Sequence, residues 1–354
     1  PIPASLPVAI PTWKPSAVSA GSSTELGVAN TGGRSLARPS WRRWSFTSVS
    51  NTREHEWAEP IEHPVVGGAD EPEQGEPNDI TVPEPTGAQP TTPSLDMPWA
   101  HTLGGTEFGT LVHGLFEHVH TNHPDLPAHL RELVTGTYRR NHAALPDDEL
   151  VRGMEAAITT PLGGIADGKH LADLAPTDRL AELSFDLPFG STPVTPTAIG
   201  EVLLATLPAN DPQRPYAQSL ADGRFTVNLE GYLQGSIDAV LRIPDAVVGH
   251  RYVVVDYKTN RLHARDASNP LAAYHPAHLP QHMAHSDYPL QALLYSVALH
   301  RFLAWRLGSQ YDPAAHLGGI AYLFVRGMVG PNTPQHGSEV TGVFSWRPPA
   351  RTTA

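Results

Sequence analysis

The chain has 354 residues, a formal net charge of −12 and no cysteine. The lack of cysteine excludes disulfides, zinc-thiolate sites and iron-sulfur clusters, and it is compatible with a reducing cytoplasm. No apolar run approaches the roughly 18 residues needed to cross a bilayer, and no signal pattern stands at the amino terminus. We therefore expect a soluble, cytoplasmic protein that makes no membrane contact.

Charge and periodicity divide the chain into segments. Residues 51–98 carry eleven acidic residues and one arginine, whereas residues 1–50 carry five basic residues and one acidic residue. Residues 54–98 also lack apolar periodicity, which is typical of a disordered, acidic and Pro-rich linker. Residues 1–40 show no period, and the chain begins at Pro1, so we expect the tail of a preceding region of a longer protein.

The run from Trp41 to Ser50 is typical of a short strand that ends in a polar turn, and residues 41–53 are assigned to the same domain as residues 99–354. This main domain opens with a helix for which Thr106 is the expected N-cap. Six apolar residues recur in the helix at helical spacing and define its buried stripe: Phe108, Leu111, Val112, Leu115, Phe116 and Val119.

His113 and Glu117 are four residues apart on this helix and lie together off its apolar stripe. They therefore face a polar space rather than the core and form a candidate pair. The chain has 19 histidines, and three of them follow within ten residues of His113, so a histidine alone does not identify a ligand.

The stretch from Gly163 to His170, after a helix expected over residues 147–159, resembles a phosphate-binding P-loop. A P-loop requires Ser or Thr after its lysine and lies between a strand and a helix. Here His170 follows Lys169 and no strand-like run precedes the glycines, so we expect no ATP site in this chain.

Residues 180–187 alternate like a strand and place Glu182 and Ser184 on one face. Glu182 is thus a candidate accessory acid near a functional site. The alternative is that it faces solvent from an edge strand.

Two apolar runs, residues 235–241 and 252–258, each carry an aspartate. Because side chains alternate along a strand, Asp256 and Lys258 point to one face and Tyr257 to the other. If the runs pair as a hairpin, Asp238 comes alongside, and two carboxylates share a small volume with an ammonium group. A divalent cation removes the cost of holding two carboxylates together, so the pattern predicts a magnesium site. A surface hairpin with solvated charges is the alternative.

The strongest helix pattern covers residues 287–307, where Tyr288, Gln291 and Tyr295 share one face. The tyrosines alone could be core residues, but a buried amide such as that of Gln291 needs hydrogen-bond partners. The unbroken apolar run of residues 319–326 predicts a strand in a sheet covered on both faces. The order strand, strand, helix, strand indicates an α/β fold.

Together these blocks resemble the carboxy-terminal nuclease domain of the RecB family, within the PD-(D/E)xK nuclease superfamily. The resemblance covers about residues 100–347 and, more weakly, residues 41–52. It implies a restriction-endonuclease-like core with a central mixed sheet flanked by helices, preceded by a linker that joins a helicase to a nuclease. The matching blocks stand in the family's order: Gly105 to Glu117, Gly235 to Asp238, Asp256 to Asn260, Tyr288 with Gln291 and Tyr295, and Gly318 to Arg326.

The resemblance also implies an activity. The implied activity is metal-dependent DNA exonuclease activity. The enzyme would be a RecBCD-type helicase-nuclease that acts in double-strand-break repair and recombination. The implied cofactor is Mg²⁺, with Mn²⁺ as a substitute, because histidine is an unusual magnesium ligand. The implied partners are DNA, as single strands delivered by a helicase, and RecC-like and RecD-like subunits.

By the same resemblance, His113, Asp238 and Asp256 would ligate the metal together with the carbonyl oxygen of Tyr257. Lys258 would orient the attacking water or stabilise the charged phosphate. These residues form the expected catalytic centre.

Five further residues would surround that centre. Glu117 and Gln291 would position ligands and the lysine, with Gln291 counted among the catalytic residues, and Glu182 would be an accessory acid. Tyr288 and Tyr295 would stack on bases or orient Gln291.

Two other functions remain open at this point: a stand-alone nuclease of the same superfamily, and an inactive nuclease fold kept as a DNA-binding or subunit-contact module. The retained acids and lysine favour the enzyme. The acidic linker has a second interpretation as a DNA mimic. Family members continue past the strand that ends at Arg326 into a terminal helix, which the Pro-rich residues 348–354 cannot form.

Overall fold

The computed structural model describes residues 42–50, 95–102, 104–136, 146–189, 193–225 and 227–349. Residues 1–40 and residues 54–94 of the predicted linker lie outside the described residues, as do residues 51–53 of the predicted first segment. The remaining linker residues, 95–98, are described, and Met97 among them packs in a core cluster.

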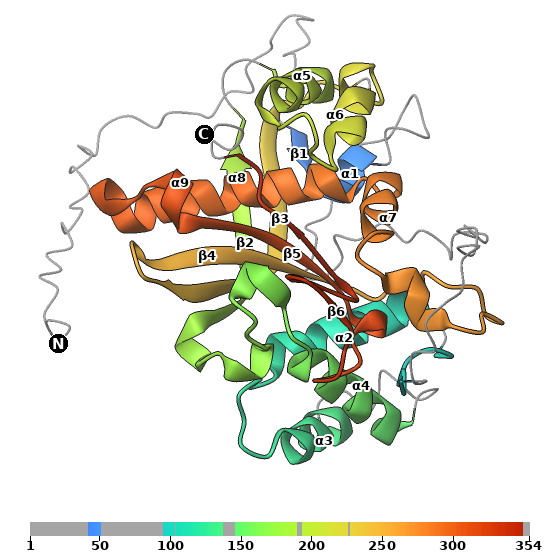
Figure 1. The fold of residues 1–354 in the computed structure, drawn as a ribbon. Coiled ribbons are helices and arrows are strands. Elements are labelled where there is room, and N and C mark those ends of the chain that lie inside the picture. Colours follow the sequence, from blue (N-terminus) through green and yellow to red (C-terminus); the bar gives the residue numbers. More distant parts are fainter. Residues whose placement is uncertain are drawn as a thin grey trace, which may run out of the picture. The chain divides into compact units, whose positions relative to one another are not determined.

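A mixed, eight-stranded sheet forms the centre of the domain (Figure 1). Seven strands follow the order β1-β3-β4-β5-β8-β7-β6, and β2 pairs with β3 outside this path. β4 runs antiparallel to β3 and parallel to β5. The strands are β1 Arg42–Trp44, β2 Arg179–Pro188, β3 Gly231–Asp245, β4 Gly249–Lys258, β5 Leu317–Phe324, β6 Gln335–His336, β7 Glu339–Val340 and β8 Val343–Trp346.

Side-chain alternation sends the residues of the central strands into two separate cores, one on each face of the sheet. On β4, Val254 belongs to one core, whereas Val253 and Val255 belong to the other. β5 behaves the same way, with Tyr322 in the first core and Leu323 in the second. The sheet is therefore covered on both faces, as its apolar run predicts.

Helices supply the other half of each core, and Figure 1 shows α8 on one side of the sheet and α2 to α4 on the other. The first face is covered by α1 Phe46–Ser50, α5 Pro196–Thr206, α6 Arg214–Ala221, α7 Leu279–His285 and α8 Tyr288–Leu307. The second face is covered by α2 Thr106–His118, α3 Leu126–Gly136 and α4 Asp147–Thr159. A short α9, Pro313–His316, leads into β5.

The helices and strands expected from strong periodicity are present, with three local differences. The strand expected over residues 319–326 is β5, which ends at Phe324, and Arg326 lies in the short 3₁₀ helix η7, Val325–Gly327. The turn expected after the first strand is the helix α1, which buries Phe46 and Val49 in the core. Thr106 is the first residue of α2 rather than its cap, and the cap is Gly105 at φ 116°, a conformation that favours glycine. The P-loop-like stretch contains the short 3₁₀ helix η2, Gly163–Ala166, and follows a helix instead of a strand.

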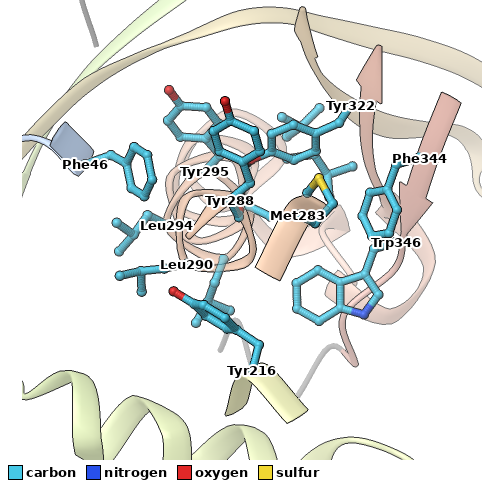
Figure 2. Close-up of a cluster of buried hydrophobic side chains, with 14 of the residues drawn as sticks. Phe46, Tyr216, Met283, Tyr288, Leu290, Leu294, Tyr295, Tyr322, Phe344 and Trp346 are labelled. Carbon is cyan, nitrogen blue, oxygen red and sulfur yellow. Dashed lines mark hydrogen bonds between the residues drawn. The ribbon is translucent and has the colours of Figure 1, made fainter. Parts of the chain in front are cut away.

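The first core is centred on α8, whose side chains meet residues from α1, α6, α7 and the sheet (Figure 2). The helix begins after Asp287, which is buried and left-handed at φ 58°. Arg224 Nε lies 2.6 Å from the Asp287 carboxylate, and the Tyr216 hydroxyl donates to the same oxygen at 3.1 Å. A buried carboxylate with these partners fixes the start of α8.

The described helices include none long and apolar enough to cross a membrane.

Candidate active site

The candidate site lies where β3 and β4 separate. The last pair of their ladder is Ala239 with Val255, and the next residue on each strand is an aspartate, Asp238 and Asp256. The Tyr257 N–H donates to Asp238 Oδ2 at 2.8 Å, so a side chain takes the place of the strand ladder. The hairpin expected from the sequence is thus present, and the two aspartates directly follow the end of its ladder.

The edge of β3 is open at this point. β2 pairs with residues 232–241 of β3 along one edge, while β1 pairs with residues 231–233 and β4 with residues 239–245 along the other. Within the described strands, residues 234–238 therefore have no strand neighbour on the second edge. Asp238 stands at the end of this gap.

Lys258 is the last residue of β4 and is fully buried, with 0% of its surface exposed. Its Nζ lies 2.8 Å from Asp256 Oδ2, and Asp256 is only 3% exposed. Nζ also lies 4.1 Å from the ring centroid of Tyr288 and 5.5 Å from that of Tyr322. A buried ammonium group needs such partners, since an ion pair and aromatic faces replace the lost water.

Gln291 is 1% exposed, and both ends of its amide group have partners. The Tyr322 hydroxyl lies 3.0 Å from Gln291 Oε1 and 3.1 Å from the Tyr288 carbonyl oxygen, and Gln291 Nε2 donates to the Tyr295 hydroxyl at 3.2 Å. Figure 2 shows the three tyrosines close together, two from α8 and one from β5. The buried amide thus has the partners that the sequence analysis requires.

Tyr322 was not predicted as a site residue. It is the register neighbour of Asp256 in the parallel pairing of β4 with β5, and its ring stacks on Tyr288 at 5.6 Å. Burial, followed by the negative charge of Asp256, raises the pKa of Tyr322 well above its ordinary value, so its hydroxyl remains a neutral donor. The one sequence pattern that points to it is its place in the apolar run of residues 319–326.

His113 reaches the site from α2, on the other side of the strands. Its Nδ1 lies 3.2 Å from Asp238 Oδ1, with 14% and 19% of the two side chains exposed. Burial alone would raise the pKa of Asp238, but the charge of His113, its hydrogen bond, the Tyr257 N–H and Lys258 together lower it. Asp238 is therefore a carboxylate at neutral pH.

Glu182 lies opposite Asp238 in the register of β2 with β3, between the pairs formed by Ala181 and Leu183. It is left-handed at φ 52°, which interrupts the strict alternation expected for this strand. Burial first, and then the neighbouring Glu117 and Asp238 carboxylates, raise the pKa of Glu182. The structure thus brings Glu117 and Glu182 to the candidate site.

Tyr257 points to the other face, as its alternation with Asp256 and Lys258 predicts. Its ring stacks on Phe116 of α2, with ring centroids 3.8 Å apart and planes 5° apart. This contact holds α2, which carries His113, against the strand whose carbonyl is the predicted metal ligand.

Asp256 faces Lys258 and Asp238 faces His113 in this structure. Among the residues that the structure describes, no three histidine, aspartate or glutamate side chains are arranged as a metal site.

Comparison with known proteins agrees with this geometry. Residues 94–340 match the family model of the PD-(D/E)XK nuclease superfamily. The chain belongs to this superfamily. The match confirms the fold class expected from the sequence, a PD-(D/E)XK core with a mixed sheet flanked by helices.

Members of this superfamily with similar sequence include three RecBCD enzyme subunits RecB. The identity is 40% over 317 residues in Mycolicibacterium smegmatis, 42% over 323 residues in Mycobacterium tuberculosis and 31% over 249 residues in Escherichia coli. These matches cover 88%, 87% and 70% of this chain but only 28%, 28% and 18% of the relatives. The chain thus spans less than a third of the proteins it matches, and the expected resemblance to RecB is confirmed.

Proposed function

We propose that this chain is the nuclease part of a RecBCD-type enzyme and that it hydrolyses phosphodiester bonds of DNA with the help of a divalent metal ion. The observation that carries the proposal is the grouping of Asp238, Asp256 and Lys258 where two strands of a PD-(D/E)XK fold separate. An inactive nuclease fold would have no need to keep all three.

The donor groups suit a hard cation. Asp238 and Asp256 are the residues at which β3 and β4 leave their ladder, directly after the pair of Ala239 with Val255. Mg²⁺ prefers oxygen ligands, so Asp238, Asp256 and the Tyr257 carbonyl would hold it, with His113 as a nitrogen ligand that also suits Mn²⁺. When bound, the metal would polarise a phosphoryl oxygen and lower the pKa of a coordinated water.

The chain's own groups supply the rest of the chemistry. Lys258 is fixed by Asp256 and Tyr288, so its positive charge is in place before charge builds up on the phosphate. Gln291, held by Tyr322 and Tyr295, fixes the face of α8 that meets the lysine. The carboxyl group of Glu182 lies near those of Glu117 and Asp238, and the two glutamates would orient Asp238 and the attacking water.

We propose single-stranded DNA as the substrate, delivered by a helicase, and RecC-like and RecD-like subunits as partners in repair and recombination. The similarity to RecBCD enzyme subunits RecB supports the assignment of RecC-like and RecD-like partners.

Cleavage of end-labelled single-stranded DNA tests the proposal. We expect cleavage with Mg²⁺ or Mn²⁺ and none in excess chelator. Lys258→Ala should slow the reaction by about 100-fold or more, which is the usual cost of losing a preorganised electrostatic group. Cleavage that persists in chelator would contradict the metal-dependent reaction, and an active Lys258→Ala variant would contradict the assigned site.

A further inference from the structure

The segment that follows Lys258, residues 259–265, is held in place although it is a loop; we call it the post-strand loop. The Tyr274 hydroxyl donates to the Asn260 carbonyl oxygen at 3.2 Å and accepts from the Leu262 N–H at 3.2 Å. Tyr274 itself is completely buried. One rigid phenol group therefore fixes the loop at two neighbouring points.

Two further elements hold the same loop. Arg326 Nε donates to the Thr259 carbonyl oxygen at 2.7 Å, and the Tyr288 hydroxyl donates to Asn260 Oδ1 at 3.2 Å. Tyr288 also covers the Lys258 ammonium group. The loop and the candidate catalytic lysine thus share a supporting side chain, and loops positioned this way by a rigid scaffold commonly carry function.

The charge of this region differs from that of the chain as a whole. Residues 259–285 contain two arginines, Arg261 and Arg265, against a single acid, Asp266, in a chain with a net charge of −12. Arg261 is half-buried and Arg265 is exposed. The region is therefore suited to an anionic ligand.

We propose that the post-strand loop binds the backbone of single-stranded DNA next to the phosphate that is cut, through Arg261 and Arg265. The inference rests on the proposed function and adds a binding surface to it. Arg261 is three residues from Lys258, so their Cα atoms are within about 10 Å, which is the reach to a neighbouring nucleotide. An arginine side chain can donate hydrogen bonds to two oxygens of one phosphate group. A loop that is already held in place loses little conformational entropy on binding.

Equilibrium binding in chelator separates this surface from catalysis. The full chain and the double variant Arg261→Gln/Arg265→Gln are titrated against a fluorescent single-stranded oligonucleotide at several salt concentrations. We expect at least tenfold weaker binding by the variant. The slope of log K against log salt should fall by roughly 1.4, since each single-strand phosphate contact contributes roughly 0.7.

Arg347→Gln is the matched control. Arg347 is exposed, donates to the Ala314 carbonyl oxygen and lies beside Gly319, at the end of the sheet away from Lys258. Arg347→Gln removes one positive charge from an exposed position, as Arg265→Gln does, and should keep wild-type binding. With Mg²⁺ present, the double variant should show a raised KM and an unchanged kcat.

Each outcome decides one question. Unchanged binding by the double variant, or a lowered kcat with unchanged binding, would overturn the role of the loop. Should the double variant unfold, Arg265→Gln alone, at an exposed position, must weaken binding and reduce the slope by roughly 0.7. Wild-type chain that binds DNA through these arginines without cleaving it would overturn the proposed function alone, and wild-type chain that does not bind DNA would overturn both.

Discussion

The ammonium group of Lys258 has little freedom of position. Lysine normally carries its charge on a flexible stem, but here Asp256 and the faces of Tyr288 and Tyr322 surround the charge in a buried space. Electrostatic stabilisation is most effective when the charge needs no rearrangement during the reaction. The residues around Lys258 should therefore affect the rate of the chemical step more than substrate binding.

Tyr322→Phe tests this expectation, because it removes the hydroxyl beside Gln291 Oε1 and keeps the ring beside Lys258. An unpaired buried acceptor costs about 1–3 kcal/mol. If the variant loses a similar free energy of transition-state stabilisation, we expect kcat to fall about tenfold or more, with KM unchanged. Steady-state cleavage of single-stranded DNA is the measurement.

Tyr311→Phe is the control, since its hydroxyl contacts His300 near the other end of α8. A wild-type kcat in Tyr322→Phe, or an equal loss in both variants, would show that the hydroxyl has no specific effect on the reaction.

Asp238, Asp256 and Lys258 could be predicted from the sequence, whereas Tyr322 could not, because its position depends on a different kind of strand pairing. Asp256 and Lys258 follow from alternation within one strand, and Asp238 follows from the pairing of two neighbouring runs. Tyr322 depends on the parallel register of β4 with β5, which are joined by a long crossover. A single sequence contains no direct information on that register, because a shift by one residue changes which face every side chain occupies.

At the scale of elements, α7 contains a histidine that should make stability depend on pH. Burial first, and then the nearby His278 and His285, lower the pKa of His282 from 6.5 to about 4. The unfolded chain therefore binds a proton that the folded chain does not, so His282 lowers stability as pH falls from about 6.5 towards 4.

We expect His282→Leu to lose less stability between pH 7 and pH 5 than the wild-type chain does. Urea unfolding at the two pH values measures the difference. Parallel losses in the two proteins would show that His282 does not carry this part of the pH dependence.

A second element, α4, uses a glycine for close packing. A Cβ atom at Gly153 would lie 2.0 Å from the buried ring of Trp99. Gly153→Ala should destabilise the fold by about 1–3 kcal/mol because the core is overpacked, although alanine favours helix by about 1 kcal/mol.

Gly136→Ala, at the end of α3, makes the same chemical change where no described residue beyond the helix itself lies within 4 Å of the new Cβ. This control should be neutral or slightly stabilising in urea unfolding. Equal effects of the two substitutions would contradict the packing argument.

The elements that could be predicted are those with long, regular patterns. The stripe of α2 and the apolar run of β5 each determine their structure by periodicity. The two-residue strands β6 and β7 have no pattern of their own and form only because β6 pairs with β7 and β7 pairs with β8. The sequence predicts a turn where the structure has α1, because the five residues of this helix are too few to show a helical period.

On the scale of the whole domain, a segment far upstream completes the sheet and the first core. β1 pairs with β3, and Trp44, Phe46 and Val49 are all buried. Removing residues 1–50 should lower the free energy of unfolding by about 4 kcal/mol or more, since each large apolar side chain contributes about 1.5–3 kcal/mol.

Removing only residues 1–39, which show no apolar periodicity, should leave stability unchanged. Chemical unfolding of the two shortened chains makes the comparison. A chain that starts at residue 51 and unfolds like the wild type would show that β1 and α1 are not part of the stable domain.

Arg326 connects two parts of the chain that perform different tasks. Its guanidinium group is buried and donates to the carbonyl oxygens of Trp99 and Thr102, while its Nε holds Thr259, the residue after Lys258. Trp99 and Thr102 lie where the acidic segment joins the nuclease fold. A mechanical load on that segment would therefore reach the neighbourhood of the lysine through the side chain of Arg326.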